Sequence, residues 1–216
     1  MKVGKIMLFK KLRYIIILNL PIITYSLNTK QLQTGDLLLQ DLSCGVQCHA
    51  INQATAKHSE SFNHVGIIYK YQNITYLIEA SSDNVHLISL DEFLNNSNQV
   101  TALRLKPKYY QLIPKFIKFS ISQIGKPYNY TYIPNDEQSF YCSQLVIEGL
   151  KYANHNQYLI KPIRMNLRDN HGNIPKYWQE LYARLNKPIP EGELGSNPNY
   201  LTQQLQYLKP INLNYQ

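Results

Sequence analysis

The sequence predicts a single domain of the α+β class. Four short segments rich in β-branched and aromatic residues follow one another between residues 64 and 106, separated by polar turns. Segments with the apolar spacing of helices lie before and after this group of strands. The chain has 216 residues, no internal repeat and no low-complexity linker, which suits one domain rather than two.

The first 26 residues have the pattern of a secretory signal peptide. Five basic residues occur within the first thirteen positions, and an apolar run from 14 to 25 follows them. This run is interrupted by Asn19 and Pro21 and is shorter than the roughly 20 apolar residues of a membrane span. We therefore expect residues 1–26 to be a signal peptide and residues 27–216 to form the domain, in the periplasm or outside the cell. The alternative is an uncleaved anchor in the inner membrane.

The basic charge of the chain is concentrated in this leader. Removing its five positive charges lowers the formal net charge from +8 to +3. A net charge of this size is ordinary for a domain of this length, and it argues against a nucleic acid as the partner.

Three cysteines leave at least one thiol unpaired. Cys44 and Cys48 are close enough in sequence to form a disulfide, which would leave Cys142 free. Any one of the three single disulfides, or a fully reduced chain, is also compatible with the sequence. A zinc site built from Cys44, Cys48 and His49 is disfavoured, because adjacent ligands point in different directions and no fourth ligand is evident. We expect neither a metal nor a cofactor.

The first half of the domain begins with a short buried strand and one helix and continues mainly as strands. We expect these elements in the order strand 35–40, helix 46–57, strands 64–71, 74–80 and 85–90, one or two helical turns at 91–94, and strand 100–106.

The second half is mainly helical. Residues 113–124 form an amphipathic helix, with Pro114 in its first turn and Gly125 as its stop. A loop rich in Pro, Asn and Tyr leads to a helix that begins near Cys142 and ends near Ala153. Further helix is expected over 175–185, and from about residue 186 an extended C-terminal arm lies over the domain.

The strand that begins at His64 pairs with the next strand in a predicted hairpin. If the turn consists of Gln72 and Asn73, His64 and Glu79 project from one face as diagonal neighbours, roughly 7–8 Å apart at the backbone. Gly66 lies between them and is expected to leave the space empty. A shift in register by one residue would place the two side chains on opposite faces.

Cys142 is the first residue of an apolar helical stripe that faces the sheet. An unpaired cysteine in such a stripe is often only a core residue. The N-terminus of a helix also stabilises a thiolate, and imidazole has a suitable pKa to act as its base. We therefore predict Cys142 as nucleophile, His64 as general base and Glu79 as the group that orients the imidazole. The Cys142 backbone amide would stabilise the oxyanion.

The other histidines lack a comparable setting and are expected to lie in loops or on the surface. They are His49, His58, His86, His155 and His171.

Four motifs in this order, GDLLLQ, NHVGIIY, YLIEA and YCSQLV, resemble the NlpC/p60 superfamily of cysteine hydrolases in its circularly permuted, YiiX/YebB-like branch. The resemblance covers about residues 34 to 155, and His64, Glu79 and Cys142 fall on the family's His, Glu and Cys positions. It implies a permuted papain-like fold with a small antiparallel sheet packed against helices. It also implies hydrolysis or transfer at amide, ester or thioester carbonyls, without a metal. The Cys44 and Cys48 pair is a departure from the family.

We therefore expect an exported cysteine hydrolase that cleaves an amide or acyl ester through an acyl-enzyme. Candidate substrates are peptides, including those of peptidoglycan, and lipid-like amides, in or near the cell envelope or its membrane. The alternatives are a lipid acyltransferase of the same fold and a catalytically inactive binding module. Four tyrosines near the cysteine either line a substrate groove or, for most of them, pack in the loop: Tyr128, Tyr130, Tyr132 and Tyr141.

Overall fold

The computed structural model describes residues 27–56, 61–95, 97–134 and 138–213. The predicted signal peptide lies outside the described residues. Within the described part of the chain, no helix is both long enough and apolar enough to cross a membrane.

Six strands form one antiparallel sheet in the order β4-β3-β2-β1-β5-β8. Their bounds are β1 Leu37–Leu42, β2 His64–Tyr71, β3 Ile74–Ser81, β4 Asn84–Ser89, β5 Ser97–Leu105 and β8 Leu208–Ile211. A separate two-stranded ribbon consists of β6 (Ile163–Arg164) and β7 (Leu194–Gly195).

The helices match the predicted positions closely. They are α1 Val46–Thr55, α2 Leu90–Asn95, α3 Ile113–Ser122, α4 Cys142–Ala153, α5 Lys176–Arg184 and α6 Pro198–Thr202, with short 3-10 turns η1 (Thr29–Gln31) and η2 (Pro107–Leu112). The α+β class is therefore confirmed.

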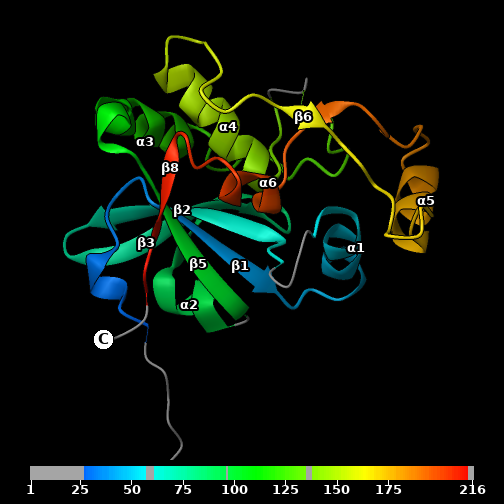
Figure 1. The fold of residues 1–216 in the computed structure, drawn as a ribbon, viewed down its shortest axis with the longest axis horizontal. Helices are drawn as coiled ribbons and strands as arrows, with labels where there is room; N and C mark the ends of the chain where they lie inside the picture. The colour runs from blue at the N-terminus through cyan, green and yellow to red at the C-terminus, as the bar shows by residue number, and fades with distance from the viewer. Residues whose placement is uncertain (1–26, 57–60, 96, 135–137, 214–216) are drawn as a thin grey trace, which may run out of the picture.

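The sheet has helices on both of its faces (Figure 1). The α3 and α4 helices cover one face, and the shorter α2 lies against the other, while α1 and α5 lie together at one end. The β1 strand shows how the sequence alternates between the two cores. Leu37 and Leu39 pack in the core that contains α3 and α4, whereas Leu38 packs with Phe93 of α2 on the opposite face.

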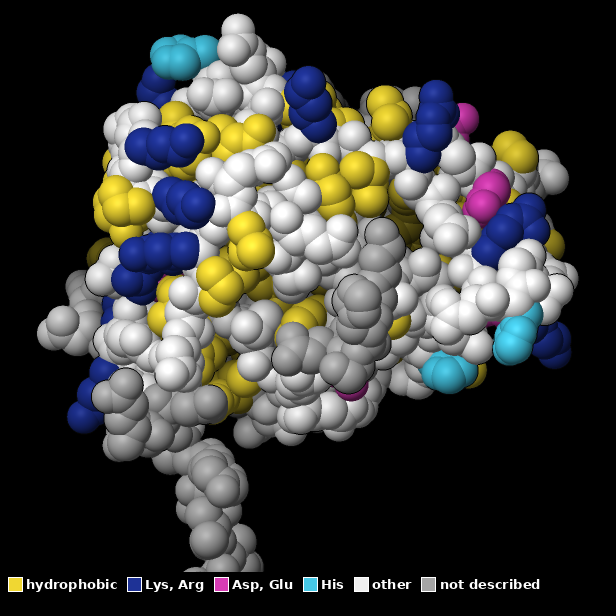
Figure 2. Space-filling model, viewed as in Figure 1, with side chains coloured by type: hydrophobic (Ala, Val, Ile, Leu, Met, Phe, Trp, Pro, Cys, Tyr) yellow, Lys and Arg dark blue, Asp and Glu magenta, His cyan; other side chains and the backbone are white. Residues whose placement is uncertain are grey.

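The surface of α3 is basic where it faces solvent. Lys and Arg side chains gather on the side of the molecule where this helix lies (Figure 2). Lys115 and Lys118 are exposed, whereas Phe116 and Ile117 are buried in the core. The amphipathic helix predicted from the apolar spacing is thus observed.

The β2–β3 hairpin has the register that the two-residue turn predicts. Tyr71 pairs with Ile74, and the pairing continues to Ile67 opposite Ile78. Gln72 and Asn73 both have positive φ angles, 48° and 65°, as a type I′ turn requires. The register places His64 and Glu79 on the same face.

The segment after residue 186 is more ordered than the expected extended arm. It contains β7, the α6 helix and the β8 strand, which pairs with β5 at the edge of the sheet. This strand has four residues, and its central Lys209 and Pro210 are exposed. Such short edge strands carry little of the alternating pattern by which strands are predicted from sequence.

Candidate active site

Cys142 is the first residue of α4, as predicted, and its side chain is buried. The helix N-terminus around it is held by Gln144, whose side-chain oxygen accepts a hydrogen bond from the Tyr141 backbone N–H at 3.3 Å. Asn129 donates to the same oxygen at 3.1 Å. The thiol therefore lies at the positive end of the helix dipole, in a backbone conformation fixed by side chains.

Cys142 is the one free thiol, because Cys44 and Cys48 form a disulfide. The pairing left open by the sequence is therefore the one between the two nearest cysteines. A disulfide sulfur is no thiolate ligand, so the zinc site that would use Cys44 and Cys48 does not fit this structure.

His64, the first residue of β2, connects the thiol to a carboxylate. Its Nε2 atom lies 2.7 Å from Glu79 Oε2, and the imidazole is also hydrogen-bonded to the Cys142 side chain. Because Nε2 faces Glu79, the bond with the thiol falls to Nδ1. Burial lowers the pKa of His64, but the charge of Glu79 and the two side-chain hydrogen bonds outweigh it and raise the pKa from 6.5 to about 10.

Glu79 accepts hydrogen bonds on both oxygens. Oε2 faces His64, while Oε1 accepts from Ser81 Oγ at 2.8 Å and lies 3.2 Å from His86 Nε2. Burial raises the pKa of this carboxyl group, but the positive charge of His64 and the three hydrogen bonds together hold it well below its usual value. Glu79 is therefore an ionised carboxylate inside the protein.

The contribution of His86 was missed in the sequence, where this residue was expected in a loop or on the surface. It lies on β4 directly opposite Glu79, with a partly exposed side chain. Its hydrogen bond with Glu79 raises the pKa of His86 despite partial burial. The second hairpin, with its turn at Ser82 and Asp83, contained the signal: the counting used for the first hairpin places His86 across from Glu79.

The prediction that Gly66 leaves an empty space was wrong. A Cβ atom at this position would lie 2.7 Å from Leu77 Cδ2 and 3.1 Å from the Phe93 ring, so neighbouring side chains already fill the space. The Phe93 ring also packs against His64, with 5.7 Å between ring centroids. Glycine at position 66 therefore lets Phe93 of α2 come close enough to support the imidazole.

The nucleophile and the base come from opposite layers of the fold. His64 contacts Phe93 of α2 on one face of the sheet, whereas α4 packs with Val65 and Ile67 of the other face. The two groups meet because His64 is at the end of its strand and Cys142 is at the start of its helix. Cys142 thus reaches His64 at the rim of the sheet, while the rest of the helix lies across it.

Two cavities adjoin these residues. One has a volume of about 50 Å³ and is lined by Cys142 but by neither His64 nor Glu79. The other has a volume of about 450 Å³ and is lined by His64, Glu79 and the disulfide but not by Cys142. Tyr128 contributes to the walls of both cavities.

The four tyrosines take different positions. Tyr132 and Tyr141 are buried in the wall of the small cavity, together with the partly buried Tyr128. Tyr130 is exposed and lines the larger one. The aromatic wall beside the thiol is therefore built from three of the four residues.

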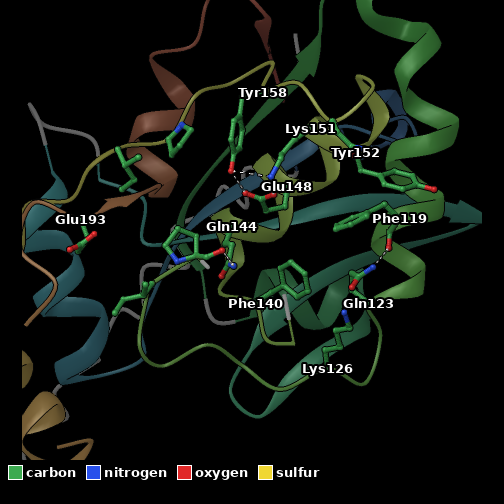
Figure 3. A pocket seen from close by; sticks show the side chains of 15 residues that line it. Phe119, Gln123, Lys126, Phe140, Gln144, Glu148, Lys151, Tyr152, Tyr158 and Glu193 are labelled. Carbon is green, nitrogen blue, oxygen red and sulfur yellow. Dashed lines mark hydrogen bonds and ion pairs between the residues drawn. The ribbon is translucent and has the colours of Figure 1, made fainter. Parts of the chain in front are cut away.

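A third cavity, of about 670 Å³, lies elsewhere around α4 and is lined by no member of this group (Figure 3). The charged groups on its wall satisfy one another. Glu148 accepts from Lys151 at 2.9 Å and from the Tyr158 hydroxyl at 2.6 Å. Its size alone therefore does not make it the reactive site.

The cysteine, imidazole and carboxylate thus form a linear series of hydrogen bonds at a helix N-terminus, beside two cavities. A thiol activated in this way is suited to attack a carbonyl carbon and form an acyl-enzyme. The arrangement is the one that thiol-dependent acyl transfer and hydrolysis require.

Known proteins share this fold. Residues 31–203 match the model of a family described as permuted papain-like amidase enzyme, YaeF/YiiX, C92 family. A solved structure described as the metalloprotein yiiX from Escherichia coli O157:H7 is also similar. The two chains have 20% sequence identity and a TM-score of 0.69, and the match covers 86% of this chain and 99% of that chain. No protein with a curated description matches the chain.

The metal mentioned for yiiX has no matching ligand group in the described parts of this chain. Among these residues, no group of three or more His, Cys, Asp or Glu side chains is placed to hold a metal ion. The nearest candidate thiolates, Cys44 and Cys48, are bonded to each other.

The family match spans most of the chain and the whole of the sheet except β8. It confirms the predicted permuted papain-like fold and the predicted cysteine hydrolase class, under a family name that differs slightly from NlpC/p60. The chain belongs to the YaeF/YiiX, C92 family of permuted papain-like amidase enzymes.

Proposed function

We propose that the protein is an exported cysteine amidase that cleaves an amide or acyl ester through an acyl-enzyme, with Cys142, His64 and Glu79 as its catalytic triad. The hydrogen-bond series from the free thiol through His64 to the buried Glu79 carries this proposal. No other described cysteine is a free thiol.

The proposed reaction begins with the Cys142 thiolate attacking the carbonyl carbon. The resulting oxyanion is stabilised by the backbone N–H of Cys142 at the start of α4. His64 Nδ1 then donates its proton to the leaving nitrogen or oxygen as the carbonyl re-forms, which leaves a thioester on Cys142. Water attacks the thioester while His64 accepts its proton, and the acid product and the free thiol are released.

Glu79 holds the imidazole in place during both half-reactions. Its Oε2 atom accepts from His64 Nε2, so Nδ1 is directed toward the thiol. The carboxylate also stabilises the imidazolium that exists while the thiol is ionised.

The disulfide supports the proposed export. Structural disulfides persist mainly in oxidising compartments such as the periplasm and the extracellular space. Together with the basic and apolar leader, the bond between Cys44 and Cys48 favours a periplasmic or secreted enzyme. Its proposed substrates are amides of envelope peptides, including those of peptidoglycan, or lipid-like amides.

Alkylation of Cys142 tests the triad directly. The oxidised protein has one free thiol, so uptake of iodoacetamide measured by intact mass reports on Cys142 alone. We expect fast alkylation at pH 5–6, where a thiol with an ordinary pKa of about 8.5 reacts slowly. His64→Ala should abolish this low-pH reactivity.

The exposed His171, changed to Ala, is the matched control and should behave like the wild type. A thiol that is inert from pH 4 to 9, or whose profile is the same without His64, would show that Cys142 is only a core residue. The inactive binding module would then be the better description.

A further inference from the structure

Trp178 has the strongest unmet bonding requirement beside the thiol. It is the only tryptophan of the chain, lies on α5 and is 2% exposed. Among the described residues, its indole Nε1–H has no hydrogen-bond partner. An unpaired buried donor costs about 1–3 kcal/mol, and native proteins contain few of them. Trp178 lines the same small cavity as Cys142, so a molecule bound there would lie beside this donor.

The wall of this cavity is mainly apolar and aromatic. Besides Trp178 it includes Tyr132, Tyr141, Met165 and Leu167. Tyr132 and Trp178 pack edge to face, with 5.3 Å between ring centroids, which makes the wall rigid. Such a surface suits an apolar group with one hydrogen-bond acceptor.

The volume of the cavity limits the size of that group. One water-sized sphere needs about 10–15 Å³ on this measure, so a cavity of about 50 Å³ holds roughly three to five non-hydrogen atoms. An acyl group of two to four carbons fits. A fatty-acyl chain does not fit without displacing the aromatic wall.

The chemistry of the triad decides which half of the substrate lies there. His64 donates its proton to the leaving group, so the leaving group must lie on the His64 side of the thiol. That side is the cavity of about 450 Å³, whose wall includes polar side chains such as Gln40, Gln47 and Ser81. The acyl half is left for the cavity that Cys142 lines without His64.

We propose that the small cavity is an acyl subsite for a group of two to four carbons, in which the Trp178 N–H donates a hydrogen bond to an oxygen of that group. This assignment rests on the proposed role of Cys142. The substrate is then a short-chain acyl derivative of a larger polar amine, and long-chain fatty amides are excluded. Trp178 is a residue that determines specificity.

The binding test uses the unique tryptophan as its probe. In the Cys142→Ala protein, which forms no acyl-enzyme, butyramide and octanamide are titrated while the fluorescence of Trp178 is recorded. We expect butyramide to change the emission saturably and octanamide to have no such effect at equal concentration. Saturable binding of octanamide with equal or higher affinity would overturn the assignment.

The kinetic test uses 4-nitrophenyl acetate, butyrate and octanoate with the wild-type protein and with Trp178→Phe. We expect kcat/KM to be at least tenfold lower for octanoate than for butyrate. Trp178→Phe keeps the ring but removes the donor, so KM for the short esters should rise about three- to tenfold, as loss of one hydrogen bond implies, with a smaller change in kcat. Tyr177→Phe, next in the sequence and outside the cavity wall, is the matched control.

The two proposals fail in different ways. An inert Cys142 together with butyramide binding would remove the triad and leave the cavity as a binding site for short acyl amides. A reactive Cys142 that prefers octanoate, or a Trp178→Phe protein with unchanged KM for every ester, would leave the triad and remove the acyl subsite.

Discussion

Glu79 is stabilised as a buried carboxylate by three neighbours. His64, His86 and Ser81 each contribute a hydrogen bond, and at least one of the imidazoles is protonated at neutral pH. A buried charge is tolerated when it is paired and its lone pairs are satisfied, and removing one partner of such a pair is costly. The same contacts that stabilise the carboxylate also fix the orientation of His64.

Replacing Glu79 by Gln tests this role at the level of one residue. Glutamine keeps the shape but removes the charge and reverses the donor pattern toward His64. We expect kcat/KM on 4-nitrophenyl acetate to fall by about 10³–10⁴, the size of loss seen when the carboxylate of a triad becomes an amide.

Glu92→Gln is the matched control, because Glu92 is exposed and lines the same cavity without contacting His64. Its activity should remain within about twofold of the wild type. Equal losses in both variants would mean that the general negative charge of the cavity matters and that Glu79 has no special place.

The raised pKa of His64 makes stability depend on pH. The folded protein keeps the His64 proton up to about pH 10, whereas the unfolded chain loses it near pH 6.5. This contribution to stability is complete below pH 6.5 and is lost as the pH rises toward 10. Urea unfolding should therefore show the wild type losing at least about 1 kcal/mol more than His64→Asn between pH 7 and 10. Parallel pH profiles for the two proteins would contradict the raised pKa.

At the level of elements, two hairpins and one helix end build the site. The β2–β3 hairpin places His64 and Glu79 on one face, and the β3–β4 hairpin adds His86. The α4 helix contributes Cys142 from its first turn. The position of this helix depends on its packing against α3, where Gly149 faces Phe116.

Gly149→Ala tests that packing. The added Cβ would lie 2.8 Å from the fully buried Phe116 ring, so one of the two helices must shift. Overpacking costs about 1–3 kcal/mol and the better helix propensity of alanine returns about 1 kcal/mol, so we expect a net loss of about 1–2 kcal/mol in the free energy of unfolding. In a Phe116→Leu background the same change should cost nothing. A Gly149→Ala protein as stable as the wild type would show that the helices are not in close contact there.

At the level of the whole molecule, the sheet is completed by a strand from the end of the chain. The β8 strand pairs with β5 and covers its edge, with Leu208 opposite Leu105. An uncovered edge invites pairing with another chain. Segments about 100 residues apart therefore act together in one structural unit.

Leu208→Ala should destabilise the whole domain, because Leu208 is 1% exposed and belongs to the same core as Cys142. We expect a loss of about 2–4 kcal/mol in the free energy of unfolding by denaturant, from lost burial and the cavity left behind. Lys209→Ala, its exposed neighbour, should change stability by less than about 0.5 kcal/mol. Equal effects of the two substitutions would mean that β8 is not part of the cooperative unit.

The strands and helices from residue 37 to 185 were largely predictable because each carries a local signal. Alternating β-branched residues marked β2 and β3, and apolar spacing marked α3 and α4. The β8 strand was missed because it is short and its partner lies far away in the sequence. His86 was missed because its role depends on a second register, which was not counted.

The sequence by itself determined the fold class, the hairpin register and the three residues that meet at the candidate site. These follow from periodicity, turn chemistry and the order of motifs, all of which are local. Tertiary structure alone decided that Cys44 pairs with Cys48, that Phe93 fills the space over Gly66, and that Trp178 of α5 comes to lie beside the thiol. These are contacts between segments with independent local patterns, and only the packing of the whole chain brings them together.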